Sequence, residues 1–401
     1  MYFAPHTHTK RSDGLIEPAD ALRFAAERGF TAYSITDHDT IAAYSDPPVI
    51  NFMKRAEESF RLIPGVELTA LLDTSERKFS DVELIGYLFD IEAKPITEAC
   101  LHNQAIRHDW TRVTLDKIND FFEFSGSDRI DEEYIRVTNS ENISSIGKPH
   151  IVKSLLLKPK VQRWLDSQKK ISELEEETFA SDKAAIEAGR IVPSEVRLKV
   201  RTEYLYSMFK SPDESGYKPI AGEFSGVFFS PKIFLSVGDA IAAIRESGGL
   251  VQIPHPFVSA KRLGMKVKDF LRLFADHFRN RSIIGLETDY PILDKYLKYY
   301  SDYRFGKSKF RDSTKTGAYL LSNEEKAIVT IKEMQEIANE DMHKYLYWLA
   351  TDPDLDLGFL ISELIHFRVS DCHFRKGDDL MHYCSGESEC RHLLELKKRL
   401  T

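Results

Sequence analysis

Two histidines separated by one residue, His6 and His8, stand near the start of the chain, in the stretch MYFAPHTHTKRSDG, and Asp13 follows them. In a strand, residues i and i+2 point to the same face, so both imidazoles can bind one metal ion. A single pair of this kind is more often an ordinary surface or core feature than a metal site. The chain contains a second pair with this spacing, Asp371 and His373 in SDCH. Two pairs at the ends of predicted strands favour a metal site.

Further residues that can bind metal ions lie near the ends of other predicted strands. Imidazole and carboxylate ligands without a thiolate suit Zn, Mn or Fe(II). A carboxylate such as Glu67 can bridge two ions, and paired ions serve phosphate hydrolysis by activating water and neutralising phosphate oxygens. The residues are Asp37 and His38 in TAYSITDHD, Glu67 in RLIPGVELTALL, Glu83 in DVELIGYLF, His255 in GLVQIPHP and Glu287 in SIIGLETDY.

The elements that must position these side chains alternate between strand and helix. Apolar residues at helical spacing predict helices within 15–30, after the Pro47-Pro48 pair, over 96–123, within 236–249 and over 266–280. Strands lie between most of these helices. This alternation predicts an α/β fold with a parallel sheet or barrel, in which functional side chains gather at the carboxyl ends of the strands.

Two polar stretches interrupt the alternation and suggest five segments. The stretch 125–232 is highly charged and helical in pattern, as expected of an insertion or cap, and 291–357 predicts a second helical insertion. We therefore expect a first barrel part over 1–124 and a second over 233–290. The last barrel strand, in LIHFRVSDCHF, and a C-terminal tail occupy 358–401.

Composition and charge narrow the functional classes. The net charge of −8, from 55 basic and 63 acidic residues, argues against a protein that coats nucleic acid through bulk charge, although a local basic groove stays open. No signal-peptide core follows Met1, and no apolar run reaches the roughly 18 residues of a membrane span. We expect a cytoplasmic protein without a membrane partner, whose four cysteines are reduced. The sequence selects no oligomeric state.

Seven short motifs occur in an order that resembles a known family. HTHTKRSDG, ITDHDT, PGVE, LIGY, GKPH, GGLVQIPHP and VSDCH are similar to the motif series of the PHP (polymerase and histidinol phosphatase) superfamily. They most resemble its stand-alone phosphoesterases, which act on nucleotides or small phosphate esters. The resemblance implies a distorted (β/α)7 barrel, here with helical insertions, and a cluster of two or three divalent metal ions (Mn, Zn or Fe).

The same resemblance implies three ligand sets. Carried over position by position, the first ion takes His6, His8, Glu67 and Asp371. The second takes Glu67, His255 and Glu83, and the third takes Asp13, His38 and His373.

Two positions depart from the family pattern. Glu83 stands where the family usually has a histidine, which shifts the second ion toward harder metals such as Mn or leaves Glu83 a solvated strand residue. His102 is a possible substitute ligand or an ordinary residue of a helix face. Ala4 and Pro5 replace a family segment with an acidic residue, so a supporting carboxylate for the first histidine is missing there.

Other residues are candidates for contact with substrate. His255 and His150 are candidate general acids, and Lys148, Lys261 and Arg262 can hold phosphate charge. The alternatives are a helix-start histidine bonded to backbone and ordinary surface cations. Glu287 can support a ligand from behind. In the tail, His382, Cys384, Cys390 and His392 form either a small zinc site or a reduced surface segment.

The function that these features predict is metal-dependent hydrolysis of a phosphate ester of a nucleotide or nucleic-acid end, by a metal-activated hydroxide. A second hypothesis is a PHP-type DNA or RNA nuclease that works with a partner such as an ATPase. It rests on the basic and aromatic segment around 295–311, which is equally typical of a packed amphipathic helix. A third hypothesis is a non-catalytic PHP scaffold, based on the altered positions 4, 5 and 83.

Overall fold

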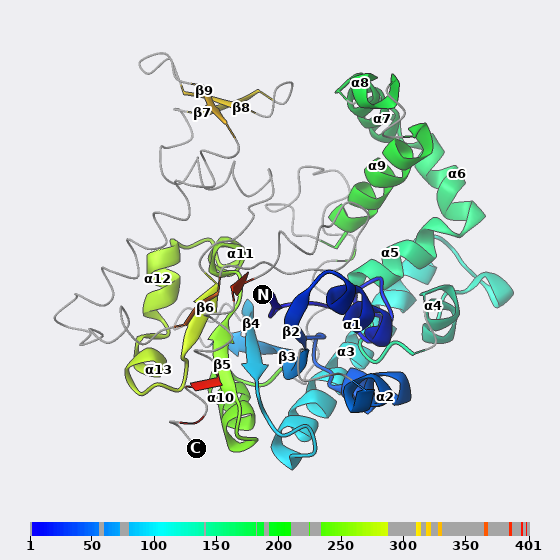
Figure 1. The fold of residues 1–401 in the computed structure, drawn as a ribbon. Coiled ribbons are helices and arrows are strands. Elements are labelled where there is room, and N and C mark those ends of the chain that lie inside the picture. The colour runs from blue at the N-terminus through cyan, green and yellow to red at the C-terminus, as the bar shows by residue number, and fades with distance from the viewer. Residues whose placement is uncertain are drawn as a thin grey trace. The chain divides into compact units, whose positions relative to one another are not determined.

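The computed structural model describes most of the first 287 residues and short segments after them (Figure 1). The described residues are 2–55, 60–72, 80–139, 142–181, 183–187, 192–209, 224 and 234–287, followed by 310–313, 318–321, 328–330, 365–367, 385–386, 394–395 and 398. They divide into two compact units, the first within 1–103 and 234–401 and the second within 104–233.

One eight-stranded sheet organises the first unit, with the strand order β10-β6-β5-β4-β3-β2-β1-β11. The sheet is curled, and the fold is mixed α/β, in agreement with the predicted class. The strands are β1 (Tyr2–Ala4), β2 (Phe30–Ile35), β3 (Arg61–Leu72), β4 (Ser80–Tyr87), β5 (Leu250–Ile253), β6 (Gly285–Glu287), β10 (Ile365–Phe367) and β11 (Ser385–Gly386).

The alternation of strands and helices predicted a parallel sheet, but the observed sheet contains both parallel and antiparallel pairs. β1, β2 and β3 run parallel, as do β5, β6 and β10, but β4 is antiparallel to both of its neighbours, β3 and β5. Only seven residues separate β3 from β4, whereas a parallel crossover needs about a dozen or more. Glu83 therefore lies within a strand, opposite Thr69, and not at a carboxyl end.

The long strand β3 explains how Glu67 reaches the edge where β1 and β2 end. Its pairing with β2 stops at Ile35 and Pro64, and Glu67 lies three residues further along, beside His38. Gly65 lets the two strands approach, since a Cβ there would lie 2.2 Å from Ser34 Oγ. The extended β3–β4 hairpin thus projects past the neighbouring strand ends and carries its acidic side chains with it.

Apolar side chains alternate along the strands and form a buried core on each face of the sheet, and helices pack against it. On one face Leu68, Leu84 and Val251 join a core with Ile241 and Ile244 of the helix α10, which packs on β3, β4 and β5. The opposite face buries another core, which includes Phe3, Ile63, Ile85, Tyr87 and Leu250. The helices of this unit are α1 (Pro18–Glu27), η1 (Ala42–Ser45), α2 (Pro47–Arg55), α10 (Val237–Glu246), α11 (Pro256–Arg262), α12 (Val267–Arg272) and α13 (Ala275–Arg279).

Helix boundaries follow local signals, with one exception. Pro18 begins α1, and Ser236 caps α10 by accepting a hydrogen bond from the Asp239 backbone N–H. The single helix predicted over 266–280 is instead two short helices, α12 and α13. A turn at Leu273 and Phe274 separates them, and Phe274 is fully buried there against Phe270.

The described residues of the second unit are mainly helical. It includes most of α3 (Lys94–Phe121), which begins in the first unit, and has its own apolar core with Ile118, Ile135, Leu155 and Leu205. Its other helices are η2 (Gly126–Asp128), α4 (Glu132–Asn139), α5 (Lys148–Leu156), α6 (Pro159–Ser167), α7 (Lys169–Ser181), α8 (Lys183–Glu187) and α9 (Pro193–Ser207).

The polar pattern of 291–357 predicted a helical insertion, and the few residues described within this stretch are in strands. Its described residues form an antiparallel sheet of β7 (Phe310–Ser313), β8 (Ala318–Leu321) and β9 (Ile328–Thr330). All three residues of β9 are β-branched, which favours an extended backbone. In the described parts of the chain, no helix has the length and apolar composition needed to cross a membrane.

We predict that Tyr44→Phe lowers the free energy of unfolding by about 1–3 kcal/mol, measured by urea denaturation. The buried Tyr44 hydroxyl donates to the Ile35 carbonyl and accepts from the Gly65 N–H at 2.7 Å, so it ties β2 to β3. Removing it leaves a buried N–H without that acceptor. Tyr134→Phe is the control, because that hydroxyl makes no hydrogen bond to the described residues. Equal stabilities of the two variants would contradict this role.

Candidate metal centre

The segment after β1 presents His6 and His8 on one side. Thr7, between them, faces the end of β2: its hydroxyl donates to the Ser34 carbonyl at 2.6 Å, and its N–H donates to Thr36 Oγ1 at 3.0 Å. The alternation of an extended backbone then turns both histidines the other way. Both are fully buried, and their Nε2 atoms are 3.1 Å apart.

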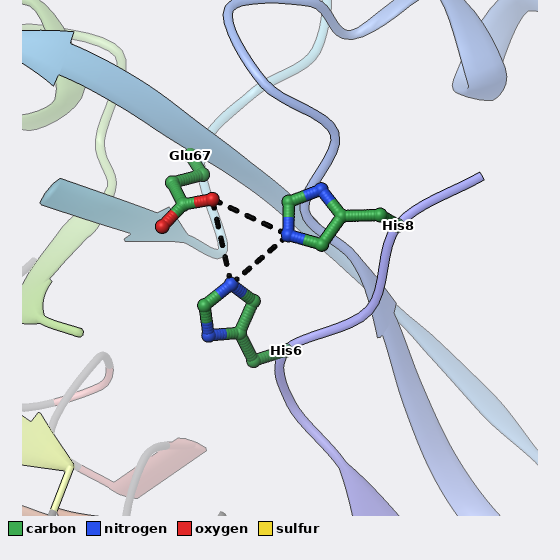
Figure 2. Close-up of side chains that lie close together, drawn as sticks. All are labelled: His6, His8 and Glu67. Carbon is green, nitrogen blue, oxygen red and sulfur yellow. Dashed lines mark hydrogen bonds and ion pairs between the residues drawn. The ribbon is translucent and has the colours of Figure 1, made fainter. Parts of the chain in front are cut away.

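Glu67 lies at the centre of the cluster, and Figure 2 shows His6 and His8 pointing toward its carboxylate. Glu67 Oε2 lies 3.5 Å from His6 Nε2 and 3.3 Å from His8 Nε2. The same oxygen lies 3.0 Å from His38 Nδ1, where the chain leaves β2. Three imidazoles from two strand ends therefore converge on one oxygen of a buried carboxylate.

A second group of ligand atoms adjoins the first through His8. Asp13 Oδ1 is 3.7 Å from His8 Nδ1 and 3.7 Å from His38 Nε2. His8 and His38 stack, with ring centroids 4.5 Å apart. His38 and Asp13 are part-exposed, whereas His8 is fully buried. This group forms the outer edge of the cluster.

His255 and Glu83 complete the cluster on the other side of Glu67. His255 Nε2 is 3.1 Å from Glu67 Oε1 and 3.6 Å from Glu83 Oε2. His255 has a backbone φ of 27°, a region that residues other than glycine rarely adopt. Backbone strain of this kind persists where the surroundings hold it, and it is frequent at functional sites.

Glu287, at the end of β6, supports two of these histidines. Its Oε1 lies 2.7 Å from His6 Nδ1, and its Oε2 accepts a hydrogen bond from the His255 backbone N–H at 2.7 Å. A carboxylate behind a ligating histidine fixes its orientation and raises its basicity. The carboxylate missing near Ala4 and Pro5 is therefore supplied by a residue 281 positions away.

Asp37 holds the loop that carries Asp13. It accepts hydrogen bonds from the Thr9 N–H, the Thr9 hydroxyl and the Ser12 hydroxyl, each at 2.6 Å. Gly14 then passes against the backbone of His8, where a Cβ would lie 2.3 Å from the His8 carbonyl oxygen. Sequence reasoning grouped Asp37 with the strand-end residues but missed Thr9, Ser12 and Gly14, although all three lie within the HTHTKRSDG motif.

The ionisation of the cluster reflects its dense charge. Burial by itself lowers the pKa of His6, but the charges of Glu67 and Glu287 and their hydrogen bonds outweigh it and raise the pKa to about 10. Burial also opposes the charge of Glu67, yet His38 and His6 hold the pKa of Glu67 well below its ordinary value. The raised pKa of His6 stabilises the metal-free fold fully below its ordinary pKa of 6.5, and this contribution is lost as the pH rises through about 10.

The donor set fits divalent metal ions. Glu67 Oε2 is buried and makes no hydrogen bond within the described part of the chain, while three imidazole nitrogens face it. The described residues form three groups of possible ligands, and within each group the ligand atoms all lie within 4.8 Å of one another. Each group combines imidazole nitrogen with carboxylate oxygen, which suits Zn, Mn or Fe(II). The groups are His6, His8 and Glu67; His8, Asp13 and His38; and His38, Glu67 and Glu83.

The remaining predicted site residues fall in different places. Arg262 pairs with Glu83, and Lys261 lies on the same helix, α11. Lys148 and His150 belong to α5 of the second unit, where the Gly147 N–H donates to His150 Nδ1 at 2.9 Å. His102 is exposed on α3. Asp371, His373 and the tail residues His382, Cys384, Cys390 and His392 lie outside the described residues, as does most of 295–311.

Comparison with known proteins finds a domain match in the first part of the chain. Residues 5–190 match the family model of the PHP domain. The chain contains a PHP domain. A crystal structure of a protein from Bifidobacterium adolescentis, assigned as a metal-dependent phosphoesterase, shares the fold of this PHP protein, with a TM-score of 0.51 and 17% identity. The match covers 98% of this chain and 95% of that one.

Two curated relatives match a shorter stretch. Both are named 5'-3' exoribonuclease Rnm. The Salmonella typhimurium protein is 34% identical over 102 residues, which are 25% of this chain and 32% of the relative. The Escherichia coli protein is 34% identical over 86 residues, 21% of this chain and 27% of the relative. The chain thus spans about a third or less of the length of these relatives.

We predict that Gly14→Ala weakens Mn²⁺ binding roughly ten- to a hundredfold, as expected when a group that supports metal ligands is displaced. The new methyl group would collide with the His8 backbone, so the loop must shift and Asp13 would lose its present position beside His8 and His38. Isothermal titration calorimetry measures the affinity, and circular dichroism checks the fold. Gly238→Ala is the control, since its Cβ would meet only Ser236 Oγ, at 3.7 Å. An unchanged Mn²⁺ affinity in Gly14→Ala would show that metal binding does not depend on the position of the loop that carries Asp13.

We also predict that Mn²⁺ binding at pH 8 releases protons, and that Glu287→Gln releases fewer protons per chain than the unmodified protein. With a pKa of about 10, His6 holds its proton at pH 8 in the metal-free protein, and an ion must displace it. Without the charge and hydrogen bond of Glu287 the pKa of His6 falls, so less of this proton remains to be displaced at pH 8. Calorimetry in buffers of different ionisation enthalpy counts the protons. His108→Gln, on the exposed pair with Glu132, serves as the control. The same count in all three proteins would contradict the assignment.

Proposed function

We propose that this PHP protein is a metal-dependent phosphoesterase that hydrolyses a phosphate ester of a nucleotide or a nucleic-acid end. The observation that carries the proposal is the convergence of His6, His8 and His38 on one buried, otherwise unbonded oxygen of Glu67. A buried carboxylate surrounded by imidazoles is costly unless cations share the site. The fold shared with the Bifidobacterium protein agrees with a site for metal ions.

Different residues of the site would bind the metal ions and orient their ligands. Divalent ions, when bound, supply an activated water and neutralise charge on the phosphate oxygens. His6, His8, Glu67 and Asp371 would hold one ion, and Glu67 can be shared with the neighbouring positions formed by His255 and Glu83 and by Asp13, His38 and His373. Glu287 keeps the His6 ring oriented.

The chain also offers groups for binding and protonation. Lys148, Lys261 and Arg262 are the proposed cations for the substrate phosphate. His255 points its Nε2 at Glu67 and Glu83, which suits a ligand. His150 accepts a hydrogen bond at Nδ1, so its neutral ring carries a proton at Nε2. Because Glu67 and Glu83 already engage His255, His150 is the proposed general acid of the two histidines, and it would act from its protonated imidazolium form.

The curated relatives favour RNA among the nucleic acids. They are named for 5'-3' exoribonuclease activity, and the matched stretch is 34% identical. We therefore propose the 5' end of RNA, or a nucleotide released from it, as the substrate. An ATPase partner has no support beyond the segment around 295–311. The scaffold hypothesis is weaker, because most of the predicted ligands are present, buried and close together.

We predict that the Mn²⁺-loaded protein hydrolyses 5'-phosphorylated short RNA or nucleotides faster than sugar phosphates or short DNA. A panel of these substrates, scored by released phosphate and by product length, measures the preference. His8→Ala should reduce the rate by more than about a hundredfold. Loss of a residue that only supports a metal ligand typically costs about ten- to a hundredfold, and loss of a ligand itself should cost more. Asp371→Ala and His150→Gln test the remaining assignments.

The control for the panel is His108→Ala, because His108 is exposed and pairs with Glu132 in the second unit. Elemental analysis of the same samples reports the number of ions per chain. Full activity of both His8→Ala and Asp371→Ala would refute the proposed metal site. Fewer than one ion per chain, with no activity after Mn²⁺ addition, would favour the scaffold hypothesis.

A further inference from the structure

Glu83 is the carboxylate of the cluster that faces two different cationic groups through one oxygen. Glu83 Oε2 lies 2.9 Å from Arg262 Nη1 and 3.6 Å from His255 Nε2. The Glu83 side chain is 10% exposed, whereas the Arg262 side chain is 41% exposed. The carboxylate is thus fixed inside the site, and its arginine partner reaches it from the solvent side.

The atoms around His255 are spaced as ligands of one ion would be. His255 Nε2 is 3.1 Å from Glu67 Oε1 and 3.6 Å from Glu83 Oε2. Two ligand atoms that each bind an ion at about 2.1 Å are separated by roughly 3–3.5 Å at ordinary coordination angles. The His255–Glu67 distance lies within this range and the His255–Glu83 distance just above it, and Glu67 and Glu83 also belong to one group of candidate metal ligands. Arg262 contributes a positive charge at the edge of this position.

A divalent ion and the guanidinium compete for this position. Both would bind Glu83 Oε2, and two cations on one oxygen repel each other strongly inside a partly buried site. The guanidinium is the group that can leave, because its side chain is long and 41% exposed. Arg262 is the last residue of α11, which begins directly after His255, so the displaced guanidinium stays close to the cluster.

We propose that Arg262 exchanges between Glu83 and substrate phosphate, and that an ion bound at His255, Glu67 and Glu83 drives the exchange. In the metal-free protein Arg262 neutralises Glu83. When an ion takes over that charge, the planar guanidinium, with five N–H donors, becomes available for a phosphate group. The inference rests on the proposed function, since it concerns how the same site recruits a phosphate ester.

The test uses Mn²⁺ and inorganic phosphate as probes, with the full-length protein and Arg262→Gln, by isothermal titration calorimetry. Without phosphate, the weakest Mn²⁺ step should tighten in Arg262→Gln by at least about fivefold, the lower end of typical coupling between linked sites. In Mn²⁺-saturated protein, phosphate should bind roughly tenfold or more weakly to this variant, as expected for a lost charge-assisted hydrogen bond. Arg262→Lys keeps the charge, so its Mn²⁺ affinity should stay near that of the unmodified protein.

The matched control is Arg279→Gln, which removes an arginine of the same 41% exposure from its carboxylate partner Asp276. It should change neither affinity. A Mn²⁺ step in Arg262→Gln that is unchanged or weaker would overturn the proposal, and so would unchanged phosphate binding. Neither measurement needs turnover, so a protein that shows both shifts but hydrolyses no phosphate ester would refute the proposed function and leave the exchange intact.

Discussion

The buried carboxylate of Glu67 is the constraint on which the site depends. An ionised carboxylate removed from water costs several kcal/mol unless it is paired. Here the pairing comes from four imidazoles, those of His6, His8, His38 and His255, which arrive from three different strand ends. The long β3–β4 hairpin is what brings Glu67 past the end of β2 to meet them. The edge of the sheet is thus organised around one negative charge.

The same charge balance explains how the cluster can exist before a metal ion binds. The raised pKa of His6 means that a proton supplies positive charge beside Glu67 at neutral pH. The proton and a divalent ion are alternative partners of the same nitrogen, so metal affinity rises with pH. The structural support, from Glu287 and from Asp37 with its loop, consists of hydrogen bonds that do not require the ion.

The sequence predicted the parts of the site that depend on local periodicity. The two-residue spacing placed His6 and His8 on one face, and the strand-end rule selected His38, Glu67 and His255 from separate segments. It could not predict that Glu287 bonds to His6, because that contact depends on sheet order. The antiparallel course of β4 and the strands β7–β9 were missed for a related reason. The alternation and polarity of side chains are properties of one sequence segment. The direction of a strand and its pairing also depend on the strands beside it in the folded sheet.

Glu83 adds a second buried carboxylate to the cluster and is paired with a cation from another element. β4 is antiparallel to β3, so Glu83 reaches the cluster from within the β3–β4 hairpin and not from the end of a strand. Its carboxylate adds a negative charge beside Glu67. A buried carboxylate at this position needs a compensating cation. The helix that follows His255 supplies that cation at its last residue, Arg262. Glu83 and Arg262 are therefore two halves of one ion pair, in which the carboxylate is buried and the guanidinium is part-exposed.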